Sequence, residues 1–145
     1  MIRILEPQDM DAVLDIWMQG SLQAHGFIEK SYWKRQKERF RETLLSHSIT
    51  AVYCDPQTDR IIGFMSLVEN FITALYVVPE EQGRGIGHHL LRRAKYLYPI
   101  LELTVYTENK SALSFYINEG FQIIRYQTDQ ATGHEEALMI HRPVR

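Results

Sequence analysis

Residues 77–91 read VVPEEQGRGIGHHLL, and this stretch decides how the rest of the chain is interpreted. An apolar run ends at a proline, and three glycines then alternate at Gly83, Gly85 and Gly87 before helical spacing begins. Glycine lacks a Cβ, so it permits positive φ and lets a ligand approach the main chain. Free N–H groups at a helix start favour an anion, and Arg84 adds a forked cation. The stretch therefore predicts a strand, a turn and a helix that together bind phosphate, with weaker positive charge from His88, His89 and Arg92.

Two well-known phosphate-binding motifs do not fit this stretch. A Walker loop needs G-x-x-x-x-G-K-[ST], and the sequence contains no such run. A dinucleotide fingerprint needs G-x-G-x-x-G, but His88 occupies the place of its third glycine. A plain tight turn is the remaining alternative, although one glycine would suffice for the positive φ of such a turn.

Working outward, apolar periodicity predicts four helices and seven strands. Asn109 is a good N-cap for the last helix, and Gly120 is a good stop. The order β-α-α-β-β-β-α-β-α-β-β predicts an α/β (α+β) fold, with a mixed sheet and helices on both faces. The expected helices are 7–20, about 30–46, 86–97 and 109–120, and the expected strands are 2–5, 49–54, 61–69, 71–79, 100–106, 121–127 and 135–141.

Length and composition indicate one globular domain over residues 1–145. The chain is 45% apolar and 23% charged, with a formal net charge of -2, which gives no overall case for nucleic-acid binding. The locally basic run at 34–42 is interleaved with glutamates and is typical of a solvated helix face. No secretory signal or membrane-spanning run is visible, so we expect a cytoplasmic protein without membrane partners.

The cysteine and histidines do not suggest a further reactive or metal site. The single cysteine, Cys54, excludes a disulfide within the chain and lies in an expected strand without basic neighbours in sequence. It is therefore expected to be a buried and inert thiol. The six histidines show neither H-E-x-x-H nor paired Cys/His spacing, so we expect no metal.

Two motifs in the right order and spacing resemble the GNAT superfamily of N-acyltransferases. QGRGIG at 82–87 matches that family's Q/R-x-x-G-x-G/A pattern. NKSALSFYINEGF at 109–121 resembles its N-x-x-A-x-x-F/Y-Y-x-x-x-G-F element. The expected order of elements is also similar to the family's, so the resemblance covers essentially the whole chain. It implies a GNAT-like, mostly antiparallel sheet of about seven strands.

The resemblance also implies acetyl-coenzyme A as co-substrate and direct attack of an amine on its thioester. The main chain of 82–88 would hold the pyrophosphate, and the strand edge at 75–78 would pair with the pantetheine arm. A backbone N–H near Val77 or Val78 would stabilise the thioester oxygen. The cofactor-binding residues implied in this way are Leu75, Tyr76, Val77, Val78, Gln82, Gly83, Arg84, Gly85, Ile86, Gly87, His88, Asn109, Ala112, Phe115 and Tyr116.

Tyr116 matches the tyrosine that protonates the leaving thiolate in many relatives, and the alternative is a core aromatic beside Phe115. The general base stays open. Thr104 stands where some peptide-acetylating members carry a glutamate, and Glu69 and His25 are the alternatives. The region around His25 would also help to shape the acceptor pocket.

Several alternatives about function remain open from the sequence. The leading hypothesis is an acetyl-CoA-dependent N-acetyltransferase acting on a small-molecule, peptide or protein amine, as a monomer or homodimer. One rival is an acyl-CoA-binding regulatory module that keeps the fold without turnover. Another is an acyltransferase that uses a longer acyl-CoA. Because no residue is an obvious general base, the regulatory module stays possible, whereas Tyr116 favours the enzyme.

Overall fold

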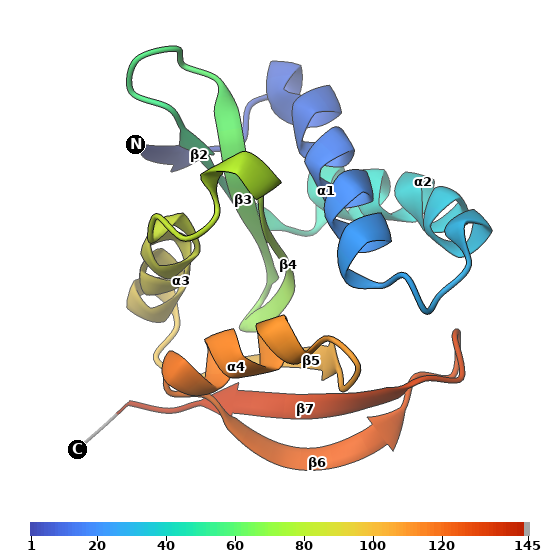
Figure 1. The fold of residues 1–145 in the computed structure, drawn as a ribbon. Helices are drawn as coiled ribbons and strands as arrows, with labels where there is room; N and C mark the ends of the chain where they lie inside the picture. Colours follow the sequence, from blue (N-terminus) through green and yellow to red (C-terminus); the bar gives the residue numbers. More distant parts are fainter. Residues whose placement is uncertain (144–145) are drawn as a thin grey trace.

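The computed structural model describes residues 1–143 and contains a mixed seven-stranded sheet in the order β1-β2-β3-β4-β5-β7-β6 (Figure 1). The strands are β1 Ile2–Ile4, β2 Ile49–Cys54, β3 Ile61–Val68, β4 Phe71–Val77, β5 Leu101–Tyr106, β6 Gln122–Thr128 and β7 Glu135–His141. The helices are α1 Met10–Ala24, α2 Lys30–Ser46, α3 Ile86–Leu97 and α4 Lys110–Asn118, with 3-10 turns at Pro7–Asp9 and Pro79–Glu81. The predicted fold class and element order are confirmed.

The first helix differs from the prediction at both ends. A 3-10 turn covers Pro7–Asp9, and α1 then runs four residues past the expected end at Gly20. The helix continues because its small residues face β4: Ser21 is fully buried, and its Oγ lies 3.2 Å from the Tyr76 hydroxyl. A Cβ on Gly20 would lie only 2.3 Å from the Tyr76 ring. Close contact between helix and strand therefore depends on glycine here.

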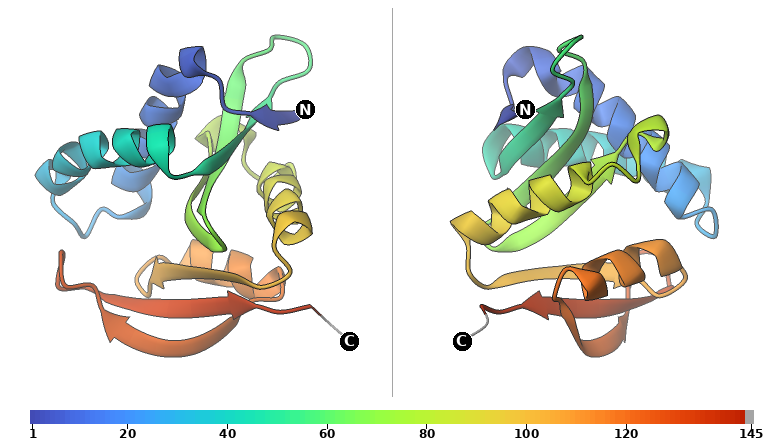
Figure 2. Two further views of the ribbon diagram at one scale, coloured as in Figure 1. Left: turned by 180° about the vertical axis from the view of Figure 1, so that it is seen from behind. Right: turned by 60° about the vertical axis from the view of Figure 1, so that its left-hand side comes forward.

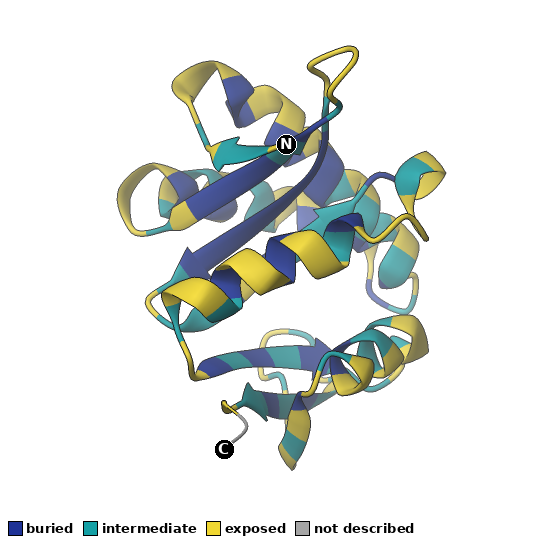
Figure 3. Cartoon of the chain, turned by 90° about the vertical axis from the view of Figure 1, so that its left-hand side faces the viewer, coloured by how far each residue is buried: buried dark blue, intermediate teal, exposed yellow. Residues whose placement is uncertain are grey.

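Helices cover both faces of the upper half of the sheet. Figure 1 shows α1 and α2 on one side of β2–β4 and α3 on the other, and Figure 3 shows β3 buried along its length. β3 therefore reads as a continuous apolar run, as expected for a strand that is covered on both faces. On α3 the buried residues Ile86, Leu90 and Ala94 recur at helical spacing, while the opposite face is exposed.

The sheet opens between its two central strands. β4 is antiparallel to β3 along its length, but it pairs in parallel with β5 only at Phe71 and Glu102. From that point β4 and β5 diverge, as the views in Figures 1 and 2 show. Beyond Phe71, the backbone groups on the β5 side of β4 are consequently left without a strand partner.

The short first strand is fixed by an ion pair. The Arg3 guanidinium donates to both carboxylate oxygens of the buried Asp9, at 2.6 and 3.0 Å. The hydrogen bond from Arg3 lowers the pKa of Asp9 below its usual value, and a backbone bond from Glu6 adds to this. β1 and the start of α1 are thereby held together.

Within residues 1–143, no helix has the length and apolar character required to cross a membrane.

Candidate active site

A groove of about 500 Å³ follows the free edge of β4 and crosses the start of α3 to reach α4. We call it the cradle groove. The divergence of β4 and β5 creates it, because no neighbouring strand covers this edge of β4. Its lining residues are Ala24, Leu75, Tyr76, Val77, Glu81, Gln82, Gly83, Gly85, Ile86, Gly87, His88, Asn109, Ser111, Ala112, Phe115 and Tyr116.

The three alternating glycines of the groove meet different structural needs. Gly83 and Gly85 have φ of 81° and 82°, a left-handed conformation that residues with a Cβ rarely adopt. Gly85 is also the N-cap of α3 and provides no side chain there. Gly87 lies within α3, where an added Cβ would meet the Phe115 ring of α4 at 3.4 Å. The first two glycines are therefore required by the backbone conformation, whereas a Cβ at position 87 would make only an ordinary contact with α4.

The turn presents a row of free backbone donors. Within the part of the chain that the structure describes, no protein group accepts from the N–H groups of residues 83–88, and the N–H of His89 is the first to bond back, to Gly85 O at 3.0 Å. Unpaired N–H groups at a helix start carry partial positive charge and bind anions well. This arrangement suits a phosphate or pyrophosphate.

Two basic side chains beside this turn, Arg84 and His88, contact carboxylates. Arg84 is ion-paired with Glu81 and does not line the groove. His88 lines the groove, but its Nδ1 lies 2.9 Å from both carboxylate oxygens of Glu119. Lys95 Nζ also donates to Glu119, through the main-chain oxygen at 2.7 Å. The attraction of this turn for anions therefore comes mainly from the backbone.

The end of β4 differs from the prediction at one residue. The N–H of Val78 donates to Ile62 O at 2.9 Å, and Val78 is buried outside the groove. Val78 therefore has no free N–H to offer a thioester oxygen. Because N–H groups alternate in direction along a strand, the N–H of Val77 faces the open side. Gln82 Nε2 donates to Val77 O at 3.0 Å and fixes the turn to this strand end.

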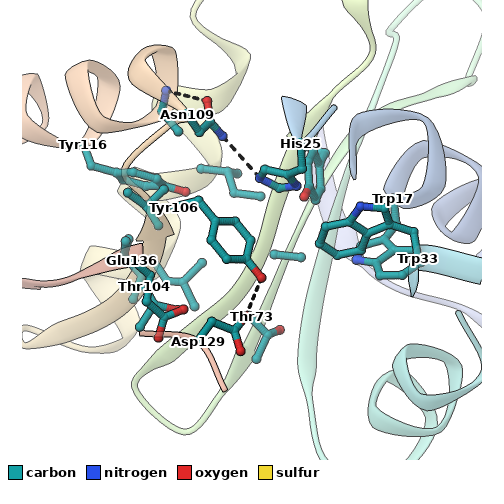
Figure 4. A pocket seen from close by; sticks show the side chains of 17 residues that line it. Trp17, His25, Trp33, Thr73, Thr104, Tyr106, Asn109, Tyr116, Asp129 and Glu136 are labelled. Atoms are coloured by element: carbon teal, nitrogen blue, oxygen red, sulfur yellow. Dashed lines mark hydrogen bonds between the residues drawn. The ribbon is translucent and has the colours of Figure 1, made fainter. Parts of the chain in front are cut away.

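A second cavity, of about 230 Å³, adjoins the groove, and we call it the inner pocket (Figure 4). Aromatic side chains, strands β4 and β5, and two carboxylates line it. Its lining residues are Trp17, His25, Trp33, Ile72, Thr73, Ala74, Leu75, Tyr76, Leu103, Thr104, Val105, Tyr106, Asn109, Ala112, Tyr116, Asp129 and Glu136. The groove and the pocket share Leu75, Tyr76, Asn109, Ala112 and Tyr116, so they meet at α4 and the edge of β4.

Tyr116 lies where the two cavities meet. Only 9% of the residue is exposed, and its ring packs edge-on against Phe115 and Phe121. Burial raises the pKa of Tyr116, and the nearby Tyr76 raises it further. The phenol is therefore held protonated at neutral pH, with a proton available to a group that leaves from the groove.

Asn109 and His25 form a polar contact at the same junction. Asn109 Oδ1 accepts from the N–H of Ala112, which caps α4, so its Nδ2 points to His25 Nε2 at 3.4 Å. This arrangement places the imidazole proton on Nδ1. Burial lowers the pKa of His25 to about 4, so the ring is neutral at physiological pH. His25 also stacks on Trp33, with a centroid distance of 5.1 Å.

The two residues suggested as the general base lie in different places. His25 lines the inner pocket, but its Nε2 already accepts from Asn109. Glu69 is exposed in the turn between β3 and β4 and lines neither cavity. Thr104 does line the inner pocket, but its hydroxyl is no general base at neutral pH. The structure thus separates Glu69 from the other candidate residues.

Several lining residues were missed by the sequence reasoning, above all Asp129, Glu136 and Tyr106. Tyr106 donates its hydroxyl proton to Asp129, and Glu136 lies opposite Tyr106 in the pairing of β5 with β7. The alternation of EEALMIH predicts that Glu136 shares a face with Leu138. Nothing local in the sequence indicates that β7 is the neighbour of β5, so this face could not be assigned to a pocket.

Solved structures show which fold this is. The solution structure of apo YjaB from Escherichia coli superposes with a TM-score of 0.85 at 23% identity, covering 99% of this chain and 98% of that chain. The PaiA N-acetyltransferase of Thermoplasma acidophilum, solved in complex with coenzyme A, gives a TM-score of 0.80 at 20% identity, with coverage of 99% and 98%. The sheet that opens between β4 and β5, together with the glycine-rich turn before α3, therefore has the GNAT fold.

Sequence comparisons identify the family. Residues 46–123, more than half of the chain, match the model of the acetyltransferase (GNAT) domain. The peptidyl-lysine N-acetyltransferase YiaC of Escherichia coli (strain K12) is 31% identical over 125 residues, covering 86% of this chain and 84% of the relative. The chain belongs to the GNAT acetyltransferase family. It is thus a GNAT-type N-acetyltransferase with acetyl-CoA as acyl donor.

Proposed function

We propose that this protein transfers the acetyl group of acetyl-CoA to the side-chain amine of a lysine in a peptide or protein, as one domain over residues 1–145. The main support is the meeting of the cradle groove and the inner pocket at Tyr116. A cofactor in the groove and an amine in the pocket would approach each other there. Lysine is favoured as the acceptor because YiaC and YjaB of Escherichia coli are named peptidyl-lysine N-acetyltransferases.

Acetyl-CoA would bind mainly to the main chain. The free N–H groups of residues 83–88 suit its pyrophosphate. The pantetheine arm would pair with the open edge of β4 at Leu75–Val77. The thioester would then lie near Tyr116, with the N–H of Val77 directed at its oxygen, where one such donor stabilises developing charge by about 3 kcal/mol.

The chemical step is direct attack by the neutral amine on the thioester carbonyl. The C–S bond breaks as the C–N bond forms, and the thiolate takes the proton of Tyr116. The amide nitrogen then loses its extra proton and restores the phenol. His25 has a lowered pKa and an occupied Nε2, so we assign it to the wall of the acceptor pocket.

The test is a panel of amine acceptors incubated with acetyl-CoA, in which the released free thiol is measured and the products are identified by mass spectrometry. Lysine peptides, an N-terminal amine, spermidine and free amino acids form the panel, and propionyl-CoA and butyryl-CoA test the acyl preference. We expect the fastest thiol release with acetyl-CoA and lysine peptides. Tight coenzyme A binding without thiol release above background on any amine would instead support a binding module.

A further inference from the structure

Glu136 is directed at the inner pocket by the pleat of β7. Side chains alternate along a strand, and Ala137 and Met139 are fully buried on the opposite face. Glu136 pairs in register with Tyr106 of β5, and both residues line the pocket (Figure 4). Glu135, one residue earlier, is exposed on the other face and accepts a hydrogen bond from the Thr107 hydroxyl.

The Glu136 carboxylate is held in place with one oxygen free. Gln127 Nε2 donates to its Oε2 at 2.6 Å from the paired strand β6. Arg125 Nε donates to Oε1 of the same Gln127 amide, which orients the amide. Among residues 1–143, no group donates to Oε1 of Glu136. A fixed carboxylate with an open oxygen is a natural partner for an ammonium group.

Asp129 adds a second negative charge to the same wall. Its oxygens accept from the Tyr106 hydroxyl and from the N–H of Ala131, so the side chain is held rigidly. The pKa of Tyr32 on α2 is raised by burial, and the charges of Asp129 and Glu136 raise it further. The charges of Arg39 and Arg35, also on α2, act on the pKa of Tyr32 in the opposite direction.

Two residues of the pocket wall also carry enclosed nitrogen atoms without a hydrogen-bond partner. His25 Nδ1 and Trp33 Nε1 have no hydrogen-bond partner, although each residue is only 8% exposed. The indole Nε1 of Trp33 is always an N–H donor. Nδ1 of His25 is a donor because its other nitrogen, Nε2, accepts from Asn109. Unpaired buried donors are costly, but both atoms are enclosed by the protein, so the proposal rests on Glu136 and not on them.

We propose that Glu136, supported by Gln127 and by the charge of Asp129, binds the positively charged amine of the acceptor and makes the inner pocket selective for cationic acceptors. The inference rests on the proposed function, because it takes the inner pocket as the acceptor site. The ammonium is held at Glu136 before it releases a proton to solvent and attacks as the neutral amine. Glu136 is thus a specificity-determining residue.

The experiment measures binding, so it needs no turnover. The protein of residues 1–145, saturated with coenzyme A, is titrated with Nα-acetyl-lysine methylamide and with Nα-acetyl-norleucine methylamide, which has no amine. Amide chemical shifts report the dissociation constants and also show that each variant is folded. Glu136→Gln is compared with the wild type and with Glu135→Gln, the matched control on the exposed face of β7.

We expect the lysine probe to bind at least about tenfold more tightly than the norleucine probe. Glu136→Gln should remove this preference, and Glu135→Gln should keep it. Equal binding of the two probes to the wild type, or an unchanged preference in Glu136→Gln, would overturn the inference. If the lysine probe binds as expected but the panel shows no thiol release, acetyl transfer fails and the assignment of Glu136 stands.

Discussion

At the scale of single residues, Tyr116 carries the chemistry that we propose. It is a buried phenol whose pKa is raised, and it is reached from both cavities. A core aromatic would have the same packing against Phe115 and Phe121, so packing does not separate the two roles. Its position at the junction of the groove and the pocket favours a chemical role.

Replacing Tyr116 with phenylalanine keeps the ring and removes the proton. We expect kcat to fall by about 10²-fold or more, because proton transfer to the leaving thiolate is lost. The dissociation constant for coenzyme A should stay close to that of the wild type. Steady-state thiol release and calorimetric titration measure the two quantities. A mutant with wild-type kcat would show that Tyr116 is only a packing residue.

A second residue-scale prediction concerns the ion pair between Arg3 and Asp9. The pKa of Asp9 is lowered in the folded state, so its charge stabilises the fold above the unfolded pKa. This contribution is lost as the pH falls through the lowered, folded value. Asp9→Asn should lower the free energy of unfolding by about 1–2 kcal/mol at pH 7.

Urea unfolding of the wild type and of Asp9→Asn between pH 7 and pH 2 shows whether the charge of Asp9 stabilises or destabilises the fold. The difference between wild type and Asp9→Asn should shrink below about pH 4, where Asp9 of the unfolded wild type becomes protonated. A difference that stays constant down to pH 2 would mean that the charge of Asp9 does not stabilise the fold.

At the residue scale, the sequence pointed to the lining of the groove where the signal was local. The glycines and Gln82 lie in one short motif, and all of them line the groove. Val78 and Arg84 do not line it. The N–H of Val78 donates to Ile62 O on β3, and the Arg84 guanidinium forms an ion pair with Glu81. Glu136 was missed because its role depends on β7 pairing with β5, a long-range contact.

At the scale of elements, the position of α1 against β4 shapes the wall of both cavities. Gly20 lets the helix approach the Tyr76 ring, and Tyr76 lines the groove and the pocket. Helix periodicity predicted α1 but not its last four residues. The apolar periodicity supported a helix only over 7–20, whereas in the structure Gly20 lies inside the helix and provides close packing.

Gly20→Ala tests this packing. Alanine normally favours a helix, but a Cβ 2.3 Å from the Tyr76 ring forces the ring or the helix to move. We expect a loss of about 1–3 kcal/mol in the free energy of unfolding. Binding of coenzyme A should also weaken, because Tyr76 lines the groove.

Gly26→Ala is the matched control, since nothing lies within 4 Å of the Cβ it would carry. Thermal unfolding and calorimetric titration of the two variants should differ clearly, with Gly26→Ala close to the wild type. Equal stability of Gly20→Ala and wild type would show that the interface between α1 and β4 adapts without strain.

At the scale of the whole molecule, the divergence of β4 and β5 creates the site. Each strand was predictable from its own apolar pattern, and the element order was correct. From the sequence, the family resemblance implied that the strand edge at 75–78 pairs with the pantetheine arm. No local pattern shows that two neighbouring strands separate after one pair. The open edge of β4 is where a ligand can complete the sheet.

Ligand binding should therefore stabilise the whole fold. At 100 times its dissociation constant, acetyl-CoA should add about 2.7 kcal/mol to the free energy of unfolding, which corresponds to roughly 5 to 10 °C in Tm. Hydrogen exchange should show protection at Leu75–Val77. Pantetheine lacks the phosphates that residues 83–88 are proposed to bind, so it serves as the control and should give a much smaller shift in Tm. A shift of equal size with pantetheine would contradict the role of residues 83–88.

The most direct measurement follows one acetyl group from acetyl-CoA to a lysine peptide by mass spectrometry while free thiol is counted. We predict one acetyl-lysine for each coenzyme A released, with product formation strongly reduced in Tyr116→Phe. The absence of acetyl-lysine, or equal formation by wild type, Tyr116→Phe and a sample without enzyme, would contradict the proposed transfer.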